Sequence, residues 1–152
     1  MTSPKARLDA LGIALPAVAA PVAAYVPAVR TGSLVYTSGQ LPTVDGHLAA
    51  IGKVGADISV EQARALAGIC VLNALAAIDA LVDLDSVVRV IKVVGFVASD
   101  PSFTEQPAVV NGASTLLTEI FGDAGAHARS AVGVAVLPLD APVEIELIVE
   151  TR

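Results

Sequence analysis

Side chains able to bind or transform a small molecule are few in this chain, and the first of them is Arg129. It stands at the head of an apolar segment whose alternate members are all small: Ala131, Gly133 and Ala135. A guanidinium with small neighbours is suited to hold a carboxylate in a two-pronged hydrogen-bonded fork. The alternative for Arg129 is an arginine at a strand end that makes only a surface ion pair.

Two glutamates near the carboxyl end are the candidate acid–base groups. Glu144 and Glu146 alternate with aliphatic residues, so the carboxylates share one face of a strand and the aliphatic side chains share the other. One of them can serve as a general acid or base, although a solvated sheet face explains the same pattern without any chemistry. If the last two strands form a simple hairpin, Arg129 lies roughly 20 Å from Glu144 along the sheet. A site that uses both residues would then take them from different chains.

Four further residues are candidates for ligand contacts. Ser38 and Gly39 end a predicted strand, where glycine lets a ligand approach the backbone and its N–H can bind an anion; ordinary turn chemistry is the alternative. Tyr25 lies between prolines, in a position for ligand contact or for packing at an edge. Asn111 falls inside an apolar helix, where asparagine is disfavoured unless it makes a hydrogen bond. His127 has no partner in the pattern, and we expect it on the surface.

The composition narrows the classes of function. With 152 residues and 55% hydrophobic content, the chain is expected to form one domain and to have apolar surface left for self-association. A net charge of −6 argues against binding a nucleic-acid backbone. The single cysteine, Cys70, excludes an internal disulfide and a cysteine zinc site, and two histidines do not make a histidine-rich site. Because no phosphate-binding loop or metal motif is present, we expect neither a metal nor an organic cofactor.

Two apolar segments could be read as a secretory signal and as a membrane span. The first 24 residues resemble a secretory signal only weakly, because Asp9 and Pro16 interrupt the apolar stretch. Residues 65–82 reach the lower length limit of a membrane span but carry Asn73 and Asp79, which favours a buried helix. We therefore predict a cytoplasmic protein with no membrane contact.

Capping and turn residues divide the chain into elements that form an α+β fold. The clearest signal is the capping box that begins at Ser59 and ends at Gln62, before an apolar run. In chain order we predict a short helix over 3–11, strands over 26–30 and 34–38, an exposed loop over 41–57, a helix over 59–81, a strand over 87–98, a helix over 107–121, and strands over 129–137 and 143–151. Two helices would then pack on one face of a mixed sheet of about six strands.

The carboxyl-terminal part of the chain resembles the signature of the Rid/YjgF family. The segment Ala128-Arg-Ser-Ala-Val-Gly-Val-Ala-Val-Leu-Pro138 followed by Val143-Glu-Ile-Glu146 carries the resemblance, and Thr37-Ser-Gly-Gln-Leu-Pro42 and the helix with Asn111 add to it. The resemblance covers about residues 20–152, with residues 1–20 as an extension. It implies a chorismate-mutase-like sandwich and a homotrimer with ligand sites between subunits.

This resemblance also implies an activity, the hydrolysis of reactive enamines and imines such as 2-aminoacrylate to 2-keto acids and ammonia. Neither a metal nor a cofactor is needed. By the resemblance, Arg129 would clamp the substrate carboxylate and Glu144 would position or activate the attacking water. The remaining pocket contacts would come from Tyr25, Ser38, Gly39 and Asn111.

Two positions depart from the family pattern. Ser114 stands where the family often has an aromatic residue, and His127 stands where it commonly has proline. These departures indicate a divergent subgroup. They leave open a second function, a non-catalytic trimeric protein that binds small carboxylates. An endoribonuclease, the family's older label, is disfavoured because the net charge is −6 and aromatic residues are only 3% of the chain.

Overall fold

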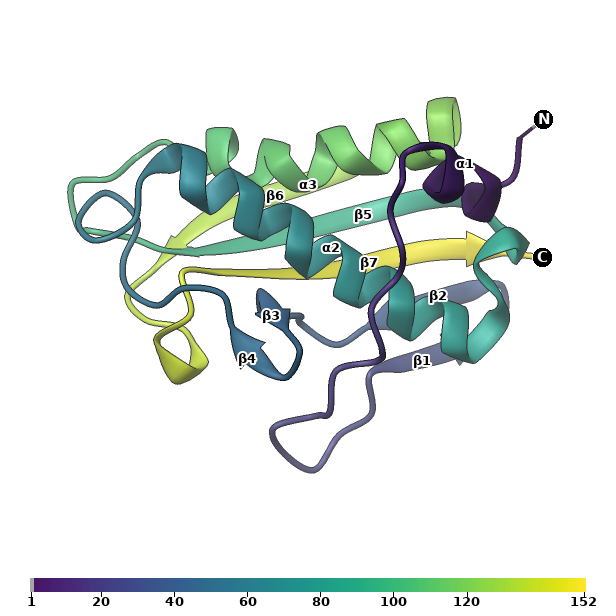
Figure 1. Ribbon diagram of the computed structural model, residues 1–152, viewed down its shortest axis with the longest axis horizontal. Helices are drawn as coiled ribbons and strands as arrows, with labels where there is room; N and C mark the ends of the chain where they lie inside the picture. The colour runs from purple at the N-terminus through teal and green to yellow at the C-terminus, as the bar shows by residue number, and fades with distance from the viewer. Residues whose placement is uncertain (1) are drawn as a thin grey trace.

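Two long helices lie over one face of a twisted sheet in the computed structural model, which describes residues 2–152 (Figure 1). The helices are α2 (Val60–Val82) and α3 (Gln106–Phe121), and a short helix α1 (Pro4–Ala10) lies near the carboxyl end of α2. Within those residues the main sheet has five strands, in the order β1-β2-β7-β5-β6. The bounds are β1 Ala28–Thr31, β2 Leu34–Thr37, β5 Val87–Ala98, β6 Ala128–Val134 and β7 Val143–Thr151. The predicted α+β class and the single covered face are confirmed.

The order of the strands differs from a succession of hairpins. β7 lies between β2 and β5 and is antiparallel to both, whereas β5 and β6 are parallel. A parallel pair needs a crossover, and α3 provides it, so β6 lies on the far side of β5. The last two strands therefore do not pair with each other as the simple hairpin would require. The main sheet has five strands where about six were expected. A separate two-stranded ribbon, β3 (Thr43–Val44) and β4 (His47–Leu48), lies in the segment that was expected to be a loop.

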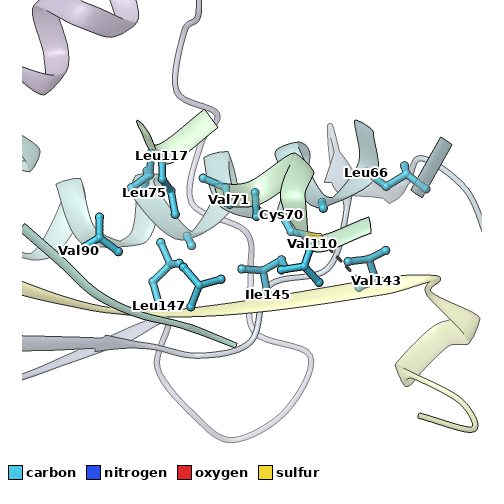
Figure 2. Close-up of a cluster of buried hydrophobic side chains, with 14 of the residues drawn as sticks. Leu66, Cys70, Val71, Leu75, Val90, Val110, Leu117, Val143, Ile145 and Leu147 are labelled. Carbon is cyan, nitrogen blue, oxygen red and sulfur yellow. Dashed lines mark hydrogen bonds between the residues drawn. The ribbon is translucent and has the colours of Figure 1, made fainter. Parts of the chain in front are cut away.

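The core lies between α2 and the two central strands. Side chains of α2 and α3 meet alternate residues of β7 and Val90 of β5. Figure 2 shows these buried residues: Leu66, Cys70, Val71, Leu75, Val90, Val110, Leu117, Val143, Ile145 and Leu147. Burial along β7 alternates strictly. One face holds the buried residues Val143, Ile145, Leu147, Val149 and Thr151, and the opposite face holds the half-buried residues Glu144, Glu146, Ile148 and Glu150. Cys70 is fully buried against the Val143 carbonyl, as expected for a small apolar side chain.

Helix α2 begins as its sequence predicts. Ser59 Oγ accepts a hydrogen bond from the Gln62 N–H at 3.2 Å, and Gln62 Oε1 accepts one from the Ser59 N–H at 2.9 Å. The helix is long and apolar enough to cross a membrane by length and composition. In the fold, however, more than half of its most apolar stretch is buried against the sheet and α3, as predicted for a core helix.

The segment over 41–57, expected to be exposed, is partly buried. The Val54 side chain is completely buried, and its N–H donates to the Ala98 carbonyl at 2.8 Å, which extends the hydrogen bonding of β5. Asn73 lies in α2 and donates from Nδ2 to the carbonyls of Leu41 and Thr43, both at 3.1 Å. A buried amide with backbone acceptors ties this segment to the core, which its glycine-rich sequence did not indicate.

The amino-terminal helix is fastened by charge to the carboxyl end of α2. Lys5 Nζ lies 2.8 Å from carboxylate oxygens of both Asp79 and Asp83, and its backbone N–H donates to Asp85 at 2.9 Å. These hydrogen bonds raise the pKa of Lys5 and lower that of Asp83. From this anchor residues 11–27 run past α2 to β1 and form the long loop at the bottom of Figure 1. We call residues 13–27 the connector.

The crossing of α2 and α3 provides a matched pair of glycine variants. A Cβ on Gly112 would overlap the Arg64 carbonyl oxygen, whereas a Cβ on Gly68 would make only ordinary contacts at 3.8 Å. Both glycines are helical, so alanine brings the same propensity gain of about 0.5–1 kcal/mol at each. We expect Gly68→Ala to raise the free energy of unfolding by about that amount, and Gly112→Ala to lower it by about 1–3 kcal/mol through overpacking. Urea unfolding of both variants measures the difference, and equal effects would contradict the close helix approach.

Candidate functional site

A small cleft lies where the connector passes the beginning of β7. Its volume is about 70 Å³, and its walls come from the connector, the segment that follows β2, the start of β7 and Pro138. Three of the residues singled out in the sequence line it: Tyr25, Gly39 and Glu144. The structure therefore brings together one candidate acid–base group, one aromatic ring and one backbone segment free of a side chain.

Glu144 packs directly on Gly39. A Cβ at position 39 would overlap Glu144 Oε1, so a glycine is needed for the carboxylate to lie where it does. The two segments are held in register by Gln40, whose N–H donates to the Ile145 carbonyl at 2.8 Å and whose carbonyl accepts from the Ile145 N–H at 3.0 Å. The close approach of backbone and carboxylate is thus set by a sheet-like pair of hydrogen bonds.

The environment of Glu144 favours its protonated form. Burial raises the pKa of its carboxyl above the ordinary value, and the nearby Glu146 carboxylate raises it further. A half-buried carboxyl with a raised pKa in a cleft is typical of groups that exchange protons with a ligand or a bound water.

Ser38 and Tyr25 hold the connector in different ways. Ser38 Oγ donates to the Val26 carbonyl at 2.6 Å, and its N–H donates to the Pro27 carbonyl at 2.8 Å. Ser38 therefore fastens the connector and does not line the cleft, where its hydroxyl was expected. Tyr25 accepts a hydrogen bond at its hydroxyl from the Val22 N–H at 3.3 Å, and its side chain remains partly exposed at the cleft.

Arg129 belongs to a second cluster, beside α3. Its Nη1 donates to Asn111 Oδ1 at 2.7 Å and to Ser114 Oγ at 3.2 Å, and Nη2 makes a long contact of 3.5 Å with the Pro107 carbonyl. Asn111 thus makes a hydrogen bond, as predicted for an asparagine inside this helix. Its partner is the Arg129 side chain rather than a ligand. The structure brings these two candidates together without Glu144.

Strand register explains the separation. Arg129 pairs with Val93, which faces the helices, and Glu144 pairs with Phe96, which faces away from them. Three residues along β5 and two strand spacings put the two Cα atoms about 14 Å apart, with side chains on opposite faces. The predicted distance was larger because it assumed a hairpin, but the inference that one chain cannot join the two groups in one pocket holds for this geometry as well.

Sequence reasoning missed His127. This residue is half-buried, with Nδ1 2.6 Å from the Gly125 carbonyl and Nε2 2.8 Å from Ser114 Oγ, so the expectation of a surface histidine without a partner is wrong. The signal was present at Gly125, where a Cβ would press on the Leu117 carbonyl, because a glycine there lets the turn after α3 approach the helix. Across residues 2–152, no three acidic, histidine or cysteine side chains gather closely enough to hold a metal.

A mixed sheet with two helices on one face, an arginine beside one of them and a glutamate on the other face define a chorismate-mutase-like α+β protein. The chain belongs to the YjgF family: the family model described as "YjgF/chorismate mutase-like, putative endoribonuclease" matches residues 5–151. Membership supports a small-molecule function of the general Rid or endoribonuclease-like type.

Several family relatives resemble the chain over nearly its whole length. Protein TCP17 of Trypanosoma cruzi is 48% identical over 147 residues, which cover 95% of this chain and 92% of that protein. The crystal structure of Atu1372 from Agrobacterium tumefaciens, a protein of unknown function, has a TM-score of 0.91 at 48% identity and covers 98% of this chain and 92% of its own. A structure from Shewanella oneidensis, described as a "putative endoribonuclease", has a TM-score of 0.93 at 37% identity, with coverage of 97% and 99%.

More distant members align less closely. The crystal structure of E. coli TdcF with bound serine is 29% identical, with a TM-score of 0.61 over 90% of this chain and 94% of that one. The TM-score is about 0.9 for the Agrobacterium and Shewanella proteins and 0.61 for TdcF. This difference agrees with the divergent subgroup that Ser114 and His127 indicate.

The raised pKa of Glu144 predicts how stability depends on pH. The folded chain keeps the Glu144 proton to a higher pH than the unfolded chain does. The free energy of unfolding therefore falls as the pH rises through the folded pKa. Below the unfolded pKa of about 4.3 the carboxyl is protonated in both states, so its raised pKa costs no stability there. We expect Glu144→Gln to raise Tm at about pH 7 and to leave it nearly unchanged at about pH 3.5. Thermal melts of the variant and the wild type, followed by circular dichroism at both pH values, measure the change in Tm.

The matched control is Glu119→Gln, which removes the same charge from an exposed position on α3. An equal gain in Tm from the control at about pH 7, or a gain from Glu144→Gln that does not change between the two pH values, would show that burial of the Glu144 carboxyl is not the cause.

Proposed function

We propose that this protein is an imine and enamine deaminase of the Rid type, which hydrolyses 2-imino acids such as the tautomer of 2-aminoacrylate. Family membership supports a small-molecule function of this kind. The relative TdcF, whose structure holds serine, binds a small molecule that carries a carboxylate and a nitrogen on one carbon, as a 2-imino acid does. In this proposal Arg129 binds the carboxylate and Glu144 acts on water.

The reaction needs only water and proton transfers. Glu144, as the carboxylate, takes a proton from a water molecule whose oxygen bonds to the imine carbon. The electron pair of the C=N bond goes to nitrogen, which takes that proton back from the Glu144 carboxyl. As the C–N bond of the resulting carbinolamine breaks and the C=O bond forms, Glu144 transfers the hydroxyl proton to the departing nitrogen, so that ammonia and a 2-keto acid are released. Nothing is oxidised or reduced. Because an imine is already activated, positioning together with one carboxylate of raised pKa is sufficient for catalysis.

The observation that carries the proposal is the placement of Arg129 and Glu144 on opposite faces of one sheet. Each group is built into its own cluster, so a complete site would form where the Arg129 cluster of one copy meets the Glu144 cleft of another. The face of the sheet that no helix covers supports such an assembly, since Val29, Tyr36 and Val132 are each more than 40% exposed. Members of this family are typically homotrimers, and we propose the same for this chain.

Four further residues complete the proposed pocket. Tyr25 and Gly39 line the cleft of Glu144, and Asn111 holds Arg129. Ser38 acts from behind by fixing the connector that carries Tyr25. We propose that this site works without metal or organic cofactor, on a small imino acid, in a cytoplasmic protein with no nucleic-acid or membrane partner.

A second candidate function is a non-catalytic protein that binds small carboxylates. The Arg129 cluster favours it, because it is complete within one chain and can hold a carboxylate whether or not Glu144 is near. The endoribonuclease label of the family has less support in this chain, whose net charge of −6 repels an RNA backbone.

A coupled assay separates these functions. A serine dehydratase generates 2-aminoacrylate, and semicarbazide traps the imine that remains. We expect the wild-type protein to reduce the semicarbazone yield, Arg129→Ala to abolish this effect, and Glu144→Gln to lower kcat by about 10²-fold or more. Glu119→Gln, an exposed variant, should behave as wild type.

A wild-type protein that leaves a panel of amino-acid-derived imines untouched would contradict the deaminase. If it then bound pyruvate in a titration and Arg129→Ala did not, the carboxylate-binding function would replace it. Cleavage of RNA that survives in Arg129→Ala and Glu144→Gln would show that this activity does not use the proposed site.

A further inference from the structure

The hydrogen bonds beside α3 form one directed chain. It starts at Arg129 Nη1, passes through Ser114 Oγ to His127 Nε2, and ends where His127 Nδ1 meets the Gly125 carbonyl, with donor–acceptor distances of 3.2, 2.8 and 2.6 Å. Asn111 Oδ1 takes the other Nη1 hydrogen at 2.7 Å. The residues come from α3, from the turn that follows it and from β6, so the chain crosses three elements.

The direction of each bond follows from the groups at its two ends. A carbonyl only accepts, so His127 Nδ1 must carry the proton that is donated to Gly125. In the neutral ring Nε2 is then an acceptor, and Ser114 must donate its hydroxyl hydrogen to it. The Ser114 oxygen keeps its lone pairs for Arg129, which can only donate. Every group therefore has a partner of the correct kind, with the ring in one defined tautomer.

The same chain of hydrogen bonds determines which edge of the Arg129 guanidinium is free to bind a ligand. Both Nη1 hydrogens are committed to α3, while Nε donates to no group within residues 2–152 and Nη2 makes only the long contact with Pro107. Nε–H and the Nη2–H beside it form one edge of the guanidinium, and two parallel donors of this kind match the two oxygens of a carboxylate.

We propose that Ser114 and His127 act together as a positioning pair, which fixes Arg129 so that its Nε and Nη2 edge receives the carboxylate of the ligand. The pair rests on the proposed function, since it assigns Arg129 the role of carboxylate clamp. His127 is a positioning residue and not a base, because both of its ring nitrogens are already engaged inside the chain. The pair stands at the two positions where this chain departs from the family pattern.

The first test needs no ligand. Nitrogen-15 NMR at about pH 8, where imidazole is neutral in water, should show His127 as the Nδ1–H tautomer, with His47→Gln used to assign the signal. The Nη1 hydrogens of Arg129, which donate to Asn111 and Ser114, should give two separate signals in wild type. These signals should broaden in Ser114→Ala, as rotation and exchange with water become faster, and return in Ser114→Thr, which keeps the hydroxyl. An Nε2–H tautomer, or an Arg129 signal unchanged by Ser114→Ala, would overturn the positioning pair.

The second test uses pyruvate as the carboxylate probe, with the full chain titrated by calorimetry. We expect Ser114→Ala and His127→Asn to weaken binding about tenfold, the size expected for one lost hydrogen bond to a charged group. Ser114→Thr and His127→Gln should bind nearly as wild type, because Gln can still accept from the Ser114 hydroxyl. In the imine assay the same loss should appear in KM more than in kcat.

The outcomes distinguish the two proposals. Equal pyruvate affinity in wild type, Ser114→Ala and His127→Asn, with binding lost in Arg129→Ala, would overturn the positioning pair and leave the clamp intact. Absence of pyruvate binding in wild type would count against the proposed function, and the NMR result would then decide alone whether the pair fixes Arg129. Melting curves show whether each variant still folds. Ser114→Ala should not weaken helix α3, because alanine has the highest helix propensity.

Discussion

The alternation of β7 is the constraint on which the rest of the structure depends. Val143, Ile145 and Leu147 are buried beneath α2, so the residues between them must face away from the helices. A shift of one residue would bury a row of carboxylates in the core and expose the aliphatic side chains. Because β7 pairs with β2 on one side and β5 on the other, its register also fixes the positions of both neighbours.

From that register the two functional clusters follow. Glu144 is directed to the uncovered face and meets the segment that continues from β2, whereas β6 places Arg129 under α3. Neither cluster is an addition to the sheet, since each uses residues whose direction the sheet has already set. The apolar core therefore sets the positions of the polar groups in both clusters, although it contains none of those groups.

Much of this could be predicted from the sequence, where the signal is local. The capping box at Ser59, the alternation of β7 and the run of β-branched residues in β5 each predicted an element that the structure confirms. The pairing of β6 was not predictable in this way, because β-branched residues and alternation are the same in a hairpin and in a parallel crossover. The structure of the 41–57 segment depends on Asn73, which is distant in sequence. His127 was misjudged for the same reason, since its partner lies on the preceding helix.

The connector has a consequence for how such a protein can diversify. It supplies one wall of the Glu144 cleft but no strand or helix of the layered core. It follows α1, which Lys5 fastens to the carboxyl end of α2, and its other end is held by Ser38, just after β2. The intervening residues are largely exposed. Mutations between those anchors can reshape the entrance to the cleft at little cost to folding, so ligand preference and thermodynamic stability can evolve almost independently in this architecture.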